Sequence, residues 1–305
     1  MRLTLLDLDG SLPPQLPALR AAAPWSSVTS TDLRDLGPRL RLWSRDRTVR
    51  AARERLRETD AEPTIHMLGS GDFHHLAALL MEQAREPITI IHFDNHPDWV
   101  RVAPRWHCGS WVNCALSLPH VDRMITLGPC SDDLVKPGLK GGNIPALASG
   151  KLVLFPWKHA PSRLYHPIPD GAGHRYDEGF VIWRNLADDF DGILASIPSL
   201  IRTDAIWFSI DKDVLPESEA LTNWDQGQMP LAQVLSAIGV IGAHKRIVGA
   251  DICGEFSSIE HANLLKRWES RMDQPRRPSN TEFLAQNERV NIALLAAIEK
   301  ASHPC

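Results

Sequence analysis

The order of apolar and polar positions along the chain predicts strands that alternate with helices. Short apolar runs typical of buried strands occur at Arg2–Leu8, Thr64–Leu68, Ile88–Asp98, Arg123–Leu127, Lys151–Phe155, Ala205–Ile210 and Ile247–Ile252. Apolar residues recur at helical spacing in Asp46–Thr59, Leu76–Gln83, Leu231–Ile241 and Phe283–Lys300. A further helix is expected to end near Ala115. This alternation favours an α/β fold with one doubly wound, mostly parallel sheet.

Three segments lack such periodicity. Pro13–Pro38 is rich in Pro and Ser and is expected to be irregular, and Arg271–Asn280 is expected to be a Pro- and Arg-rich turn. Pro156–Gly179 is long for a connection, and long loops in compact domains are often lids or binding loops.

Composition and charge narrow the range of partners. The chain has 305 residues, of which 43% are hydrophobic and 23% charged, and its net charge is -4. This balance gives no reason to expect nucleic acid or an anionic membrane as partner. With no apolar run long enough to cross a bilayer and no secretory signal, we expect a cytoplasmic protein. The five cysteines are scattered and form no C-x-x-C pair, so neither a disulfide framework nor a structural zinc site is expected.

The strand that starts at Ile88 ends in three residues of the kinds that bind metals, Asp94, His96 and Asp98. Residues two apart in an extended chain share one face, so these groups can converge on one point. Two carboxylates and an imidazole suit a divalent metal such as manganese or zinc. The alternative is a strand end with a capping aspartate and a surface histidine.

Two other strand ends carry similar groups. His74 follows the glycine turn after Thr64–Leu68, and Asp211 and Asp213 follow Ala205–Ile210. Parallel strands open their ligand crevice at the same edge. Four carboxylates would balance two divalent cations, and such a pair can hold a bridging hydroxide that attacks an sp² carbon. A phosphate-binding loop at Gly69–Gly71 is a weaker interpretation because the Walker lysine is absent.

At this point the chain resembles the arginase, agmatinase and formiminoglutamase family of manganese ureohydrolases. The family's Gly-Gly-Asp-His motif resembles Gly71–His74, with one residue inserted before the histidine. Its Asp-Ala-His-x-Asp motif resembles Asp94–Asp98, and its Ser-x-Asp-x-Asp motif resembles Ser209–Asp213. The resemblance spans roughly Thr64 to Glu255. It implies a single three-layer αβα domain over residues 1–305 that assembles as a homo-oligomer.

The resemblance also implies a role for each matching residue. It assigns one Mn²⁺ to His74 and Asp98, the other to His96 and Asp213, and both to the bridging Asp94 and Asp211. Asp213 would also orient the hydroxide. His107, before Cys108 and Gly109, resembles the histidine that passes a proton to the leaving amine. Glu255 resembles the glutamate that grips the guanidinium, although it stands one position later than in the family.

Departures from the family pattern concern the substrate. Leu215–Glu217 stands where the family has Asp-Pro, and Thr222–Asp225 replaces a Gly-Thr-Gly segment. We therefore expect a small guanidino or amidino substrate other than arginine.

Three alternative functions remain open. A deacetylase-like amidohydrolase of the same superfamily would use one zinc ion, and a catalytically silent homologue would bind metal without turnover. A phosphatase built on Asp7 and Asp9 is the third, because Asp7–Ser11 resembles the first motif of haloacid-dehalogenase-type phosphatases.

Overall fold

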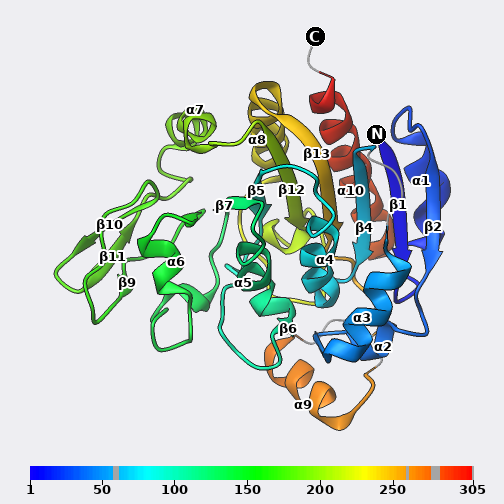
Figure 1. The fold of residues 1–305 in the computed structure, drawn as a ribbon, viewed down its shortest axis with the longest axis horizontal. Coiled ribbons are helices and arrows are strands. Elements are labelled where there is room, and N and C mark those ends of the chain that lie inside the picture. Colours follow the sequence, from blue (N-terminus) through cyan, green and yellow to red (C-terminus); the bar gives the residue numbers. More distant parts are fainter. Residues whose placement is uncertain (58–61, 259–260, 276–281, 304–305) are drawn as a thin grey trace.

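The computed structural model describes residues 1–57, 62–258, 261–275 and 282–303. Its centre is an eight-stranded sheet in which every neighbouring pair is parallel (Figure 1). The strand order is β2 (Val28–Asp32), β1 (Arg2–Asp7), β4 (Thr64–Gly69), β13 (Arg246–Cys253), β12 (Ala205–Asp211), β5 (Ile88–Phe93), β7 (Val121–Leu127) and β8 (Leu152–Phe155). The predicted parallel sheet is confirmed.

Helices cover both faces of the sheet, which gives three layers. One apolar core includes residues of α3 (Asp46–Arg55), α4 (Ala77–Met81), α5 (Trp111–Leu116) and α6 (Ile144–Ala148). The other includes residues of α1 (Leu16–Ala21), α7 (Phe190–Leu200), α8 (Leu231–His244) and α10 (Glu282–Ser302). Every residue of β4, β5 and β12 is buried. Strands covered on both faces explain the continuous apolar runs in the sequence.

Most predicted elements are present with shifted ends. The helix expected over Leu76–Gln83 is split into a 3₁₀ turn, η2 (Gly71–Leu76), and the short α4. The strand expected to reach Asp98 ends at Phe93. The helix expected over Asp46–Thr59 ends at Arg55, and its last two expected residues lie outside the described residues.

Several elements were not expected from the sequence. β2 and α1 lie inside Pro13–Pro38, which was expected to be irregular, and the short α2 (Gly37–Leu40) begins at its end. No residue of β2 is buried, because it is an edge strand, and so it carries no apolar signal. α9 (Leu264–Asp273) takes in the start of the expected turn at Arg271–Asn280, whose residues 276–280 lie outside the described chain.

Two small antiparallel sheets complete the structure. β9 (Ser162–Arg163), β10 (His174–Asp177) and β11 (Phe180–Trp183) form one of them, so Pro156–Gly179 is partly strand (Figure 1). β3 (Trp43–Ser44) and β6 (Trp106–His107) form the other. Within the described ranges, no helix is long and apolar enough to cross a membrane.

Candidate metal centre

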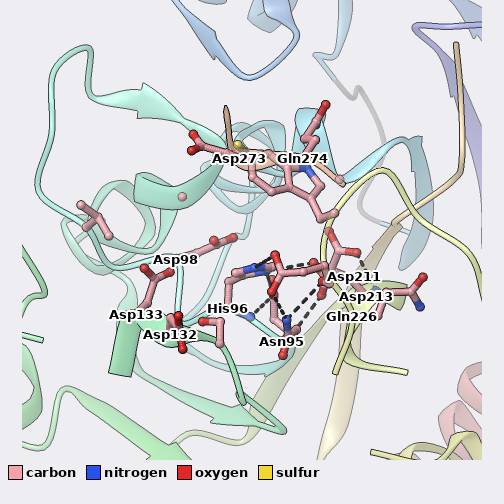
Figure 2. A pocket seen from close by; sticks show the side chains of 18 of the residues that line it. Asn95, His96, Asp98, Asp132, Asp133, Asp211, Asp213, Gln226, Asp273 and Gln274 are labelled. Atoms are coloured by element: carbon pink, nitrogen blue, oxygen red, sulfur yellow. Dashed lines mark hydrogen bonds and ion pairs between the residues drawn. The ribbon is translucent and has the colours of Figure 1, made fainter. Parts of the chain in front are cut away.

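A pocket of about 940 Å³ lies beyond the carboxyl ends of the central strands. Its walls come from the loops after β5 and β12, residues 130–133 after β7, the segment around His107, and residues 272–275 at the end of α9. Figure 2 shows the carboxylates that these separate segments bring together, among them Asp98, Asp133, Asp211, Asp213 and Asp273. The predicted convergence of strand ends is therefore present in the structure.

His74 is held so that one ring nitrogen faces carboxylates. Its Nε2 lies 2.9 Å from the hydroxyl oxygen of Ser209, which in turn donates to Asp251 at 2.8 Å. Its Nδ1 has no hydrogen-bond partner although the side chain is 1% exposed. That atom lies 3.2 Å from Asp94 Oδ2, 3.4 Å from Asp98 Oδ2 and 3.7 Å from Asp211 Oδ2. A histidine anchored at one nitrogen, with the other buried and unpaired, is typical of a metal ligand.

Asp94, His96 and Asp98 converge, but not through extended backbone. The strand ends before Asp94, and Asp98 has a φ of 45° in the left-handed region. The loop is instead held by hydrogen bonds: the His96 amide donates to Asp94 Oδ1 at 2.6 Å, and the Trp111 indole donates to Asp98 Oδ2 at 2.7 Å. Asp94 lies near both of the others, whereas His96 and Asp98 belong to different groups of close ligand atoms, and the predicted extended geometry is wrong.

The third motif completes a second group around His96. Asp211 ends β12, and its Oδ1 accepts the Asp213 amide at 3.0 Å, which starts the 3₁₀ turn η5 (Lys212–Val214). Asp213 then lies with Oδ2 at 3.0 Å from His96 Nδ1, and its Oδ1 accepts the Asn95 amide at 3.0 Å.

Asp94 connects the two groups. Its Oδ2 faces His74 at 3.2 Å, and its Oδ1 lies 3.5 Å from Nδ1 of His96. Among the described residues, three sets of ligand atoms are mutually close: His74, His92, Asp94 and Asp98; His74, Asp211 and Cys253; and Asp94, His96 and Asp213. Each group has the nitrogen and oxygen donors that a divalent cation takes.

His92 belongs to the first group of close ligand atoms, and the sequence interpretation missed it. It is fully buried on β5, with Nε2 3.0 Å from Asp94 Oδ2 and Nδ1 3.2 Å from the Thr126 hydroxyl. The available signal was the alternation itself, because His92 precedes Asp94 by the same interval of two that separates the other ligand types.

The buried carboxylates of these groups lie close enough together to shift one another's pKa. Burial and the neighbouring Asp94 raise the pKa of Asp98 to about 6. Burial and Asp211 raise the pKa of Asp213 well above its ordinary value, and burial and Asp94 also raise that of Asp211. Despite its burial, hydrogen bonds from three histidines hold the pKa of Asp94 well below its ordinary value. The charged Asp94 in turn disfavours ionisation of the other three carboxylates. Two divalent cations would neutralise the charge of all four, so the donor set fits a metal pair.

His107 lines the same pocket and is oriented from both sides. Its Nδ1 accepts the Gly109 amide at 2.9 Å, so Nε2 carries the proton and donates to Glu269 Oε1 at 2.8 Å. Glu269 comes from α9 and is itself held by the Trp43 indole at 2.7 Å. The sequence interpretation did not anticipate this carboxylate, which is 162 positions away from His107.

Glu255 does not reach the pocket. Its side chain is 1% exposed and forms an ion pair with the fully buried Lys212. The same carboxylate accepts from Asn291 at 2.6 Å and from Gln15 at 3.0 Å. The geometry thus assigns Glu255 to a buried polar network under the site, and not to the substrate.

Asp7 and Asp9 also lie away from the pocket, and arginines pair with both. Asp7 Oδ2 lies 2.5 Å from Arg34 Nε, and Asp9 Oδ2 lies 3.3 Å from Arg41 Nη2. Neither residue belongs to the described groups of close ligand atoms. Nothing in this arrangement favours the phosphatase alternative.

Comparisons with known proteins agree with the fold. No family model matches the chain. An uncharacterized protein of Thermotoga maritima is 24% identical over 234 residues, which cover 77% of this chain and 67% of that protein.

Among solved structures, formimidoylglutamase from Bacillus subtilis has a TM-score of 0.62 and 11% identity, with 98% of this chain and 85% of that chain covered. Arginase from Medicago truncatula has a TM-score of 0.61 and 14% identity, with 99% and 86% covered. Agmatine ureohydrolase of Thermoplasma volcanium has a TM-score of 0.58 and 12% identity, with 98% and 89% covered. The resemblance to ureohydrolases is confirmed at the level of the fold.

Proposed function

We propose that residues 1–305 form one binuclear, manganese-dependent hydrolase domain that cleaves a linear C–N bond in a guanidino or amidino compound. The observation that carries the proposal is the arrangement of Asp94, whose two oxygens face His74 and His96 separately. A carboxylate shared in this way suits two cations held side by side. The fold supports the proposal, because arginase and formimidoylglutamase structures share it.

The resemblance to the ureohydrolases implies the assignment of the metal ligands, and the contacts of Asp94 support it. His74 and Asp98 would hold one ion, His96 and Asp213 the other, and Asp94 and Asp211 both. When bound, such a pair supplies a strong nucleophile from water at neutral pH and offsets negative charge on a tetrahedral carbon.

The chain's own groups would then handle orientation and protons. Asp213, whose Oδ2 lies 3.0 Å from His96 Nδ1, would orient the attacking water. His107 would donate a proton to the leaving amine and recover it from solvent, with Glu269 holding the ring. General acid catalysis of this kind contributes about 10²- to 10⁴-fold to the rate.

The pocket walls favour a positively charged substrate. Besides the four ligand carboxylates, Asp132, Asp133, Asp225 and Asp273 line it, whereas no Lys or Arg does among the residues that the structure describes. Such a wall attracts a guanidinium or amidinium cation and repels a carboxylate. This distribution supports a substrate other than arginine, whose α-carboxylate would find no cationic side chain here.

Substrate charge provides the first prediction. With manganese present, we expect kcat/KM for 4-guanidinobutylamine to exceed that for 4-guanidinobutanoate by at least about tenfold, or about 1.4 kcal/mol. Urea release measured at low and high salt tests it, because raising the salt should narrow the difference. Equal rates on both compounds at low salt would contradict the charge argument.

Metal content tests the proposed function itself. Protein purified with manganese should contain close to two ions per chain by elemental analysis and should release urea or a related amide from a guanidine or amidine panel. One tightly held zinc per chain with amide hydrolysis would favour the deacetylase-like alternative. Bound metal with no turnover would favour the silent homologue.

Glu269 provides a second prediction, as a residue that positions His107. Glu269→Gln keeps a hydrogen-bond acceptor for the His107 ring but replaces the carboxylate that holds it. We expect kcat to fall about tenfold or more with KM nearly unchanged, because a general acid acts in the transition state and not in substrate binding. Trp43→Phe, which removes only the other bond to Glu269, is the matched control and should have a smaller effect on kcat. An unchanged kcat in Glu269→Gln would rule out this positioning role.

A further inference from the structure

A cysteine lies inside the ligand cluster and has no role in the function proposed above. Cys253 is the last residue of β13, and its side chain is fully buried. Its sulfur lies 3.0 Å from Asp211 Oδ2. The ligand atoms of Cys253, His74 and Asp211 all lie within 4.8 Å of one another.

The sheet topology explains this position. β13 lies between β4, which leads to His74, and β12, which ends in Asp211. The register pairs Cys253 directly with Asp211, and a register shift between Ile252 and Cys253 adjusts its pairing with Gly69. Cys253 also lies two residues after Asp251, the carboxylate that anchors His74 through Ser209. Residues two apart on a strand share a face, so Cys253 lies on the face of the sheet that supports His74.

A second observation indicates that a metal ion binds beside Cys253. His74 Nδ1 is buried without a hydrogen-bond partner, and it faces the carboxylates of this cluster. A cysteine whose only role was packing would not require an unpaired imidazole nitrogen beside it. Nitrogen, sulfur and carboxylate oxygen together form a donor set typical of zinc.

We propose that Cys253 is a sulfur ligand of the ion bound by His74, so that this position prefers zinc or another thiophilic cation to manganese. The inference rests on the proposed metal centre. On binding, the S–H bond would break, the metal–sulfur bond would form and the thiol proton would leave to solvent, so that the thiolate adds one negative charge to the ligand set. Thiolate ligands select zinc and its soft neighbours, whereas sites made only of carboxylate and imidazole accept manganese. The position around His96 has no sulfur in its group and keeps the manganese-type donor set.

Cobalt provides the spectroscopic test. Metal-free wild-type protein titrated anaerobically with Co²⁺ should develop a near-ultraviolet sulfur-to-cobalt charge-transfer band. Cys253→Ser, which keeps a donor to Asp211, should bind cobalt without that band. Cys130→Ser is the matched control, because Cys130 lines the pocket outside the ligand groups, and it should keep the band. Cobalt binding without a band in wild type overturns the inference even if the variants do not fold.

Competition between metals measures the preference for zinc that a sulfur ligand would cause. In titrations of zinc against a large excess of manganese, Cys253→Ser should show at least about tenfold weaker preference for zinc than wild type, the scale seen for lost ligand support. Two metals per chain with the same preference in both proteins would overturn the sulfur ligand and leave the proposed hydrolase standing. No bound metal in either protein would overturn both.

Discussion

Asp211→Asn is expected to abolish the stabilisation that metal confers on this protein. Asp211 Oδ2 faces His74 Nδ1, and its Oδ1 starts the turn that carries Asp213, so both proposed ions depend on it. An ion at about 1,000 times its dissociation constant stabilises a folded protein by about 4 kcal/mol. We expect wild type to show a gain of this size on adding manganese, and Asp211→Asn to show almost none and to lose activity.

The same substitution should leave the metal-free protein at least as stable as wild type. Burial and Asp94 disfavour the charged form of Asp211, and a neutral amide removes one charge from the cluster. Thermal melts with and without manganese separate the two effects. Asp132→Asn makes the same charge change in the wall of the pocket, and it should retain the metal-dependent gain. Full metal content in Asp211→Asn would rule out the proposed centre.

Glu255→Gln is expected to destabilise the fold by about 3–5 kcal/mol, the cost of leaving a buried charge without its partner. Lys212 is fully buried, and its ammonium contacts only Glu255 and Asn291 among the hydrogen bonds of the described chain. The amide of the variant cannot supply the lost negative charge. Urea unfolding of the metal-free protein measures the change.

A companion variant separates a structural role from substrate binding. Lys212→Met combined with Glu255→Gln removes both charges, so the double variant should recover much of the loss in a double-mutant cycle. KM for a guanidino substrate should stay within about twofold of wild type in Glu255→Gln, since the residue does not line the pocket. A large rise in KM with little loss of stability would instead support the substrate role that the resemblance implies.

Much of the architecture followed from the pattern of apolar residues. Buried parallel strands are apolar throughout, so seven of the eight strands were visible, and their polar ends marked one edge of the sheet. Local geometry was less accessible. The turn at Asp98 is stabilised by Trp111, from a helix that starts 13 residues later, and alternation within the motif cannot show such a contact.

α9 shows why other parts were missed. Its buried residues include Lys266 and Ser270, whereas Leu264, Leu265, Trp268 and Met272 are exposed. This polarity is inverted relative to an ordinary surface helix, so the sequence pattern gave no hint that Glu269 of this helix would contact His107. Likewise, the position of Glu255 depends on Lys212, Gln15 and Asn291, which only tertiary structure brings together.

Gly254 lies beside the proposed metal ligands, and its backbone leaves no room for a side chain. It has a φ of 89°, and a Cβ there would lie 2.5 Å from Asp211 Oδ1 and 2.7 Å from the Lys212 amide. A glutamate introduced at position 254 would therefore strain the backbone and collide with Asp211, a proposed metal ligand. An engineered acid for binding a guanidinium is better placed among the residues that already line the pocket, such as Asp273.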